Sequence, residues 1–168
     1  MEDATTPSNP AIHIRIAATG DEALVCRFVH ELADYERLAD ACEATEQAIA
    51  ASLFTVSPRV FCAIADADGE PAGFALWFYN FSTFLSKHGL YLEDLYVRPA
   101  FRGRGLGKAL LKHLAQRAVA EGCGRFEWSV LDWNTLSIAF YESLGARAMT
   151  EWTGFRLEGE ALATLAHA

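Results

Sequence analysis

The chain has 168 residues, of which 52% are hydrophobic and 21% are charged, and its formal net charge is -8. This composition is typical of one folded domain with a sizeable core, and it excludes a chain that is disordered throughout. The negative charge argues against nucleic acid as the main partner, because a phosphate backbone requires a basic surface. It favours a cationic or neutral small molecule; the alternative is an acidic surface that serves only solubility.

No membrane span, secretion signal or metal site is predicted. No apolar run approaches the roughly 20 residues that a bilayer span requires. Residues 1–11 are rich in Thr, Pro, Ser and Asn without an apolar centre, so we expect a disordered polar tail there. The spacing of the four cysteines fits neither a CxxC motif nor a disulfide framework, so we expect reduced thiols in a cytoplasmic protein. No set of residues has metal-ligand spacing, so no metal is expected.

The first half of the chain alternates between strand and helix patterns. Isoleucines at every second position predict a strand over residues 12–16. Asp21 is placed to cap the helix that follows, and a second helix is expected from near Thr45 to before Pro58. Two apolar runs, residues 60–66 and 74–81, flank the turn "ADGEPAG" and predict a hairpin.

The second half continues the alternation, so we expect a single domain over residues 12–168. Its predicted elements are a strand over 90–97 ended by Pro99, a helix over about 105–121 ended by Gly122, a strand over 125–131, a helix over about 135–144 ended by Gly145, and a last strand over 148–157.

The joint between the strand 90–97 and its helix is rich in glycine and arginine. "RGRGLGK" (102–108) lacks the third glycine of a Rossmann fingerprint and the first glycine and the Ser/Thr of a Walker A loop. Glycines before a helix still let backbone N–H groups approach an anion closely. Arg102 and Arg104 add positive charge, so the joint suits a pyrophosphate. A tight turn with solvated arginines is an equally weighted alternative.

The wider sequence resembles the GNAT acetyltransferase superfamily. Arg102, Gly105 and Gly107 fill that superfamily's acyl-CoA pattern, Arg/Gln-x-x-Gly-x-Gly/Ala. "ELADYE", "YLEDLYV", "LDWN", "FYESLGA" and "TEWTGFRLEGEAL" are similar, in the right order, to the spermidine/spermine (diamine) N-acetyltransferase branch. The resemblance implies an α/β fold of the α+β type, with a mixed, mostly antiparallel sheet that is splayed at its centre and flanked by helices. It also implies acetyl-CoA as co-substrate and a homodimer.

The resemblance assigns residues to acetyl-CoA. The pantetheine arm is expected on the strand Leu95, Tyr96 and Val97, and Asn134 near its cysteamine end. The pyrophosphate is expected on the loop, which comprises Arg102, Gly103, Arg104, Gly105, Leu106, Gly107 and Lys108.

The chemistry of amine acetylation indicates the catalytic groups. A primary amine is mostly protonated at neutral pH, so a carboxylate must accept its proton, and Glu93 is the candidate, directly or through a water. A backbone N–H near Leu95 is expected to stabilise the oxyanion. The resemblance makes Tyr141 the candidate acid that protonates the departing thiolate. A solvated or arginine-paired Asp94 and a core Tyr141 are the alternatives.

The acceptor is less constrained by the sequence. The resemblance implies an amine groove formed by Tyr35, Glu36, Asp94, Glu151 and Trp152, which suits a polyamine, a diamine or a thialysine-like amino acid. The polyamine enzymes carry Asp-Pro-Trp before the catalytic strand, where this chain has Ser82, Thr83 and Phe84. A protein or peptide N-acetyltransferase and a non-catalytic acyl-CoA-binding module are the alternative functions.

Overall fold

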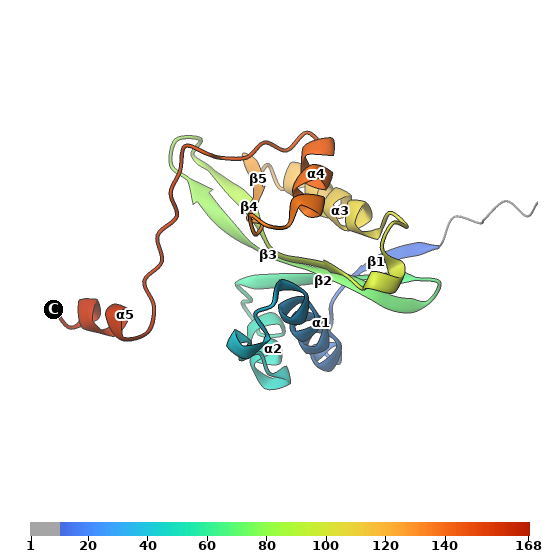
Figure 1. Cartoon of the computed structure of the whole chain (residues 1–168), viewed down its shortest axis with the longest axis horizontal. Coiled ribbons are helices and arrows are strands. Elements are labelled where there is room, and N and C mark those ends of the chain that lie inside the picture. Colours follow the sequence, from blue (N-terminus) through green and yellow to red (C-terminus); the bar gives the residue numbers. More distant parts are fainter. Residues whose placement is uncertain (1–10) are drawn as a thin grey trace, which may run out of the picture. The chain divides into compact units, whose positions relative to one another are not determined.

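The computed structural model describes residues 11–168, and the chain divides after Ser129 into two compact units (Figure 1). The first unit contains the whole sheet, and the second contains α4 (Thr135–Ser143) and α5 (Gly159–Ala166). Apart from Ala11, the predicted polar tail lies outside the described residues. The single domain over 12–168 stays a prediction.

The first unit is built on a five-stranded sheet in the order β1-β2-β3-β4-β5. Its strands are β1 (Ile12–Ile16), β2 (Val60–Ala67), β3 (Glu70–Ser82), β4 (Lys87–Val97) and β5 (Arg125–Trp128). The first four pair antiparallel and β5 joins β4 in parallel, so the predicted hairpin and the mostly antiparallel mixed sheet are confirmed.

Helices cover both faces of this sheet. α1 (Glu22–Glu36) and α2 (Glu46–Leu53) lie on one face, and α3 (Leu106–Ala120) lies on the other (Figure 1). One-turn 3-10 helices span Ala39–Ala41 and Pro99–Phe101. In the rest of this text, the face covered by α1 and α2 is called the α1 face.

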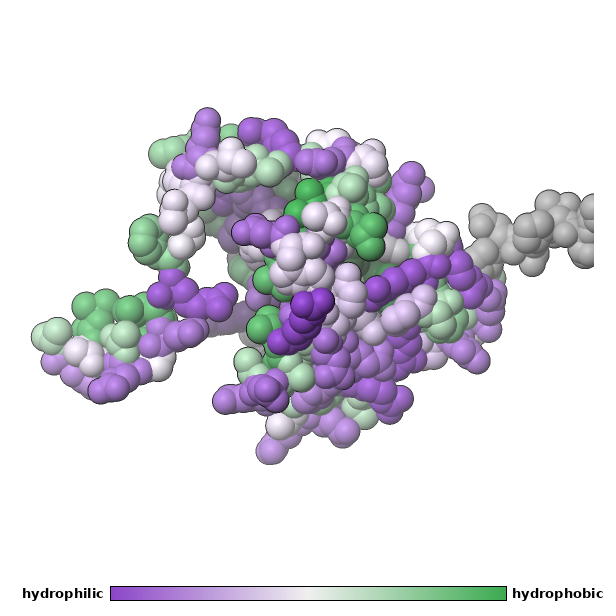
Figure 2. All heavy atoms as spheres, in the orientation of Figure 1, coloured by the Kyte–Doolittle hydropathy of each residue, from purple (hydrophilic) through white to green (hydrophobic). Residues whose placement is uncertain are grey.

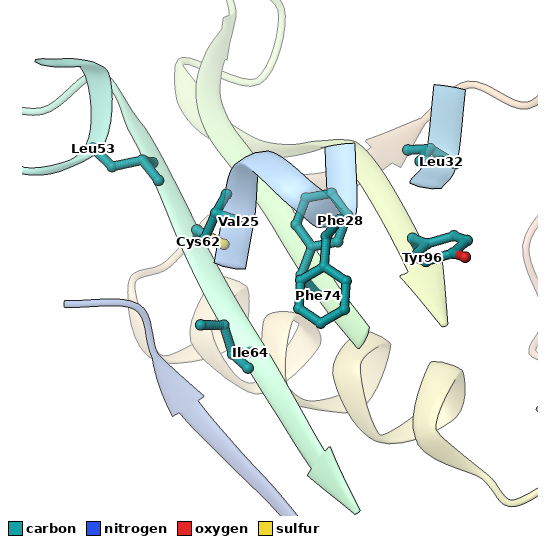
Figure 3. Close-up of a cluster of buried hydrophobic side chains, with 8 residues drawn as sticks. All are labelled: Val25, Phe28, Leu32, Leu53, Cys62, Ile64, Phe74 and Tyr96. Atoms are coloured by element: carbon teal, nitrogen blue, oxygen red, sulfur yellow. The ribbon is translucent and has the colours of Figure 1, made fainter. Parts of the chain in front are cut away.

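A core cluster lies between α1 and the sheet (Figure 3). Phe28 of α1 stacks on Phe74 of β3 with ring centroids 5.5 Å apart, and Tyr96 of β4 packs at 6.4 Å from Phe28. Both phenylalanines are fully buried, which stabilises each by about 1.5–3 kcal/mol relative to exposure. The cluster therefore fixes α1 against the strand that the sequence singles out for function.

The two predicted helix starts differ in how they are capped. Thr45 accepts a hydrogen bond from the Ala48 N–H at 3.1 Å, as a capping side chain does. Asp21 occupies the N-cap position of α1, but its carboxylate accepts instead from Arg15 at 2.7 and 2.9 Å and from the Ala18 N–H at 2.8 Å. The predicted capping bond of Asp21 is therefore wrong, because a charged partner on β1 competes for the same oxygens.

β4 changes its partners at Glu93. Leu92 opposes Trp77 and Asp94 opposes Leu76, so Glu93 is an extra residue that forms a β-bulge. β5 pairs only with Gly89–Leu92, so within the described chain the stretch Glu93–Val97 is paired to β3 alone. The sheet is therefore splayed between β4 and β5, which lies at the edge of the described sheet and not at its centre.

Arg98 fixes the end of β4 to α1. Its guanidinium donates to both carboxylate oxygens of Glu31 at 2.7–3.2 Å and to the Pro71 carbonyl at 2.9 Å. It also lies 4.7 Å from the centroid of the Phe28 ring. The last residues of β4 are therefore held by side chains where β5 does not reach.

Three expectations for the C-terminal part need correction. β5 ends at Trp128, so the strand predicted over 125–131 is shorter. The predicted strand over 148–157 is absent from the described structure, and the helix α5 follows where none was expected. An alternating pattern becomes a strand only when a neighbouring strand pairs with it, and no strand within residues 11–168 pairs with this segment. No helix within residues 11–168 is long and apolar enough to cross a membrane.

Candidate active site

The glycine loop ends at the N-terminus of α3. Gly105 is the N-cap residue with a φ of +90°, and Gly103 has a φ of +74°, a conformation that glycine adopts most readily. No side chain caps α3, so its first backbone N–H groups have no capping partner among the described residues. The loop thus provides backbone donors and the positive end of a helix dipole, which suits an anionic group.

The two loop arginines have intramolecular partners. The Arg102 Nε donates to the Val97 carbonyl at 2.8 Å, and its guanidinium lies 4.4 Å from the Tyr35 ring centroid. Arg104 forms an ion pair with Asp68 in the β2–β3 turn. Tyr35, predicted for the amine groove, is therefore brought to the acyl-CoA loop.

At the remaining positions of the loop and of β4, mainly backbone N–H and C=O groups are available to a ligand. Leu106 and Tyr96 point into the core, whereas Lys108 is exposed. Leu95 and Val97 are half-buried on the open stretch of β4. Backbone N–H and C=O groups on one edge of a strand can bind an extended ligand as an added strand.

The bulge places two carboxylates side by side on β4. Glu93 is exposed, and Asp94 turns to the α1 face together with Tyr96. Burial raises the pKa of Asp94 to about 6, and the negative charges of Glu93 and Glu36 add to this. Burial also raises the pKa of Glu36 at the end of α1. The structure thus brings together three of the predicted acidic residues.

Residues 134–152 of the predicted site belong to the second unit. Asn134 is buried and caps α4, where its Oδ1 accepts from the Ser137 N–H at 3.2 Å. Tyr141 lies on α4, with its ring centroid 5.5 Å from that of Phe140. Glu151 and Trp152 are exposed. Their joining with Glu93 in one site stays a prediction.

The structure shows an aromatic pair on the α1 face that the sequence analysis does not predict. The Phe78 and Tyr91 rings have centroids 5.0 Å apart, and the Tyr91 hydroxyl lies 2.7 Å from Ser129 Oγ. Without the bulge, strand alternation would place Tyr91 and Asp94 on opposite faces. The extra residue Glu93 brings them to the same face, and a bulge has no sequence signature here that would reveal it.

The acyl-CoA expectation can be tested against this geometry. An extended thioester arm ending in a pyrophosphate needs an unpaired strand edge followed by anion-binding backbone groups. The open stretch Glu93–Val97, the loop 102–108 and the start of α3 lie consecutively in one compact unit. The residues present therefore fit acetyl-CoA.

Comparison with known proteins agrees with this geometry. Residues 26–146 match the model of the Acetyltransferase (GNAT) family. The chain is 40% identical over 167 residues to thialysine N-epsilon-acetyltransferase of Sus scrofa, covering 93% of this chain and 98% of that one. It is 34% identical over 163 residues to human spermidine/spermine N(1)-acetyltransferase-like protein 1, covering 91% of this chain and 23% of that one.

A solved structure shares the fold over nearly the full length. An integron cassette protein from the mobile metagenome of V. cholerae superposes with a TM-score of 0.79 at 31% identity, covering 94% of this chain and 99% of that one. Enzymes of the family use acetyl-CoA as co-substrate. The chain is thus an acetyltransferase that belongs to the GNAT family, in its diamine-type branch.

Proposed function

We propose that this enzyme transfers the acetyl group of acetyl-CoA to a primary amine of a small molecule. The observation that carries the proposal is the open stretch Glu93–Val97, which continues through the glycine loop into the uncapped start of α3. Two carboxylates, Glu93 and Asp94, stand at the point where this stretch begins. Acyl donor and acceptor sites therefore meet at the bulge.

Acetyl-CoA supplies the activated thioester carbonyl, and the chain's own residues hold and neutralise it. The backbone of Leu95–Val97 binds the pantetheine arm, and the loop 102–108 binds the pyrophosphate. Arg104 exchanges Asp68 for a phosphate oxygen, since an exposed ion pair contributes only about 0–1 kcal/mol and is easily broken. Asn134 contacts the cysteamine end.

Glu93 accepts a proton from the acceptor ammonium, and the neutral amine then attacks the thioester carbonyl. Tyr141 donates a proton to the departing thiolate. Asp94 is the second candidate base, because its pKa of about 6 makes it a better proton acceptor near neutral pH than an ordinary carboxylate. An N–H close to Leu95 stabilises the oxyanion. Glu36 keeps the groove acidic, which favours a cationic acceptor.

The acceptor class is proposed from the groove and the relatives together. One relative is named for the ε-amine of thialysine and another for spermidine and spermine, so a thialysine-like amino acid and a polyamine or diamine are the candidates. Glu151 and Trp152 are proposed to contact the acceptor in either case.

An amine panel tests the function. Thiol release from acetyl-CoA is measured with diamines, polyamines, lysine-type amino acids and a lysine-containing peptide. We expect turnover of small amines at a kcat/KM above that of the peptide. Turnover of the peptide alone would favour a protein acetyltransferase, and acetyl-CoA binding without any turnover would favour a non-catalytic module.

We also propose that the enzyme is a cytoplasmic homodimer. The four free cysteines support a reducing compartment. The second unit supports a dimer, because its segment 149–165 exposes Trp152, Phe155 and Leu165, with Phe155 96% exposed. Figure 2 shows hydrophobic atoms gathered at α5. Light scattering after gel filtration should give twice the monomer mass, and a monomer would contradict this.

A further inference from the structure

A cluster of polar residues lies on the α1 face beyond the aromatic pair. It comprises Asn80 of β3 and Arg125 and Glu127 of β5, and is called the Arg125 cluster here. Arg125 Nε lies 2.8 Å from Glu127 Oε2, and the Asn80 Nδ2 donates to the same oxygen at 3.0 Å. Registry with β4 puts Arg125 beside Gly89 and Glu127 beside Tyr91, so the cluster shares the face of Tyr91.

Gly89 makes room for this cluster. A Cβ at Gly89 would overlap Asn80 Oδ1 and lie 2.9 Å from Arg125 Cγ. The aliphatic part of the Arg125 side chain therefore packs over Gly89, in the space that a side chain would fill. The Asn80 Oδ1 atom is buried and accepts no hydrogen bond from a described residue, whereas the buried Arg125 Nε is held by its ion pair with Glu127. A buried polar atom is rarely left without a hydrogen bond, because this costs about 1–3 kcal/mol.

The guanidinium end of Arg125 is available to a ligand. The side chain is 37% exposed, and its ion pair with Glu127 runs through Nε, which leaves the two terminal nitrogens for a ligand. Such a planar pair of donors matches a carboxylate in bidentate geometry. Glu127, directly beside it, offers a negative charge. The cluster therefore presents opposite charges a few ångströms apart.

Spacing along the sheet relates the cluster to the reacting end. On β3, Leu76 opposes Asp94 and Phe78 opposes Tyr91, so the levels of Asp94 and of Tyr91–Glu127 are two residues apart, about 7 Å. The backbone of Arg125 lies two residues further along, level with Gly89, and its side chain reaches Glu127. An extended lysine-type side chain puts its amine about 6 Å from its Cα. Between the two levels stands the Phe78–Tyr91 pair, which can pack on a methylene chain.

We propose that the Arg125 cluster binds the head group of an α-amino acid whose side-chain amine is acetylated, with Arg125 on the α-carboxylate and Glu127 on the α-ammonium. The proposal deepens the proposed function and rests on it. A diamine keeps an ammonium for Glu127 but has no carboxylate for Arg125, so the Arg125 charge stays uncompensated by the acceptor. A lysine inside a peptide lacks both head-group charges. The cluster thus selects amino acids over the corresponding diamines and over proteins.

Matched pairs of acceptors test this selection. Steady-state kinetics compare lysine with cadaverine and ornithine with putrescine, which differ only in the α-carboxylate. We expect kcat/KM to favour each amino acid, and Arg125→Gln to lower that preference about 10- to 100-fold through KM, as loss of a charged hydrogen bond predicts. Lys112→Gln, which removes a positive charge from an exposed position of α3, is the control and should leave the preference unchanged.

The outcomes distinguish a failure of the head-group assignment from a failure of the proposed function. An equal loss for amino acid and diamine in Arg125→Gln would assign the residue to folding and overturn the proposal. If that variant does not fold, lysine and lysinamide are compared on the unaltered protein, and equal kcat/KM values would overturn it. Absence of thiol release with every amine would overturn the proposed function itself. Turnover without a preference for amino acids over diamines would overturn only the head-group assignment.

Discussion

The two halves of β4 differ in how many neighbours they have. Lys87–Leu92 lies between two strands over most of its length, whereas Glu93–Val97 is paired on one side only within the described structure. The border is one extra residue, Glu93, which ends the pairing with β5 and turns Asp94 onto the face of Tyr91. One inserted residue thus separates the half of β4 that lies beside the proposed head-group site, called the recognition half, from the half beside the proposed reaction site, called the reacting half.

Removing the carboxylate of Glu93, the residue between the two halves of β4, should have the largest effect, which is on kcat. Glu93→Gln keeps the bulge but removes the proton acceptor, so we expect kcat to fall about 10²- to 10⁴-fold. The acidic limb of the kcat/KM profile should flatten. The profile is measured with a fixed amine between pH 5 and 9, with Asp94→Asn as comparison. A flat limb in Asp94→Asn and a normal one in Glu93→Gln would move the base role to Asp94.

A methyl group on β3 that presses against the reacting half of β4 should destabilise the protein. The Cβ of Gly73→Ala would overlap the Tyr96 carbonyl and lie 3.1 Å from Val97 Cα. Both are backbone atoms that cannot turn away, so the free energy of unfolding should fall by about 3 kcal/mol. Urea unfolding followed by circular dichroism measures this change. An unchanged midpoint would mean that the open stretch of β4 shifts freely.

Neutralising Asp94 should stabilise the protein at high pH. Its pKa is raised to about 6 by burial, so the folded protein binds this proton more tightly than the unfolded chain. Stability from this group is complete below the ordinary carboxyl pKa and is lost as the pH rises through about 6. Asp94→Asn should therefore gain about 3 kcal/mol at pH 8 and almost nothing at pH 4. An equal gain at both pH values would contradict the raised pKa.

The corresponding change in the recognition half should cost least. Gly89→Ala meets side chains of Asn80 and Arg125, which can move, so the free energy of unfolding should fall by less than about 1 kcal/mol. The displaced Arg125 should raise KM for lysine more than for cadaverine. Comparison with Gly73→Ala by the same urea and kinetic assays shows whether the halves respond differently. Equal stability losses would remove the distinction.

Much of this fold follows from local sequence patterns. The isoleucines of β1, the hairpin around the turn after Ala67 and the positive-φ glycines that end α3 and α4 are all visible locally. The glycine loop was predicted for the same reason, since its residues are consecutive. Pairing between strands that lie far apart in the sequence cannot be predicted from local patterns. The segment 148–157 has a strand pattern, but no described strand pairs with it.

The predicted site divides in the same way. Glu93, Asp94 and Glu36 are brought together by the bulge and by the end of α1, as the resemblance implies. Tyr35 was expected in the groove, but its ring lies against Arg102. Arg125 and Glu127 could not be identified from the sequence, because their role depends on Gly89 in another strand and on a parallel register.

The contacts of Arg98 determine when the end of β4 loses its conformational entropy: during folding or during ligand binding. A strand paired on one side would ordinarily fluctuate, and a ligand would have to order it on binding. Arg98 ties the end of β4 to Glu31, Phe28 and Pro71, so this ordering takes place when the chain folds. Binding then costs less conformational entropy, because the edge already has the shape that the ligand needs.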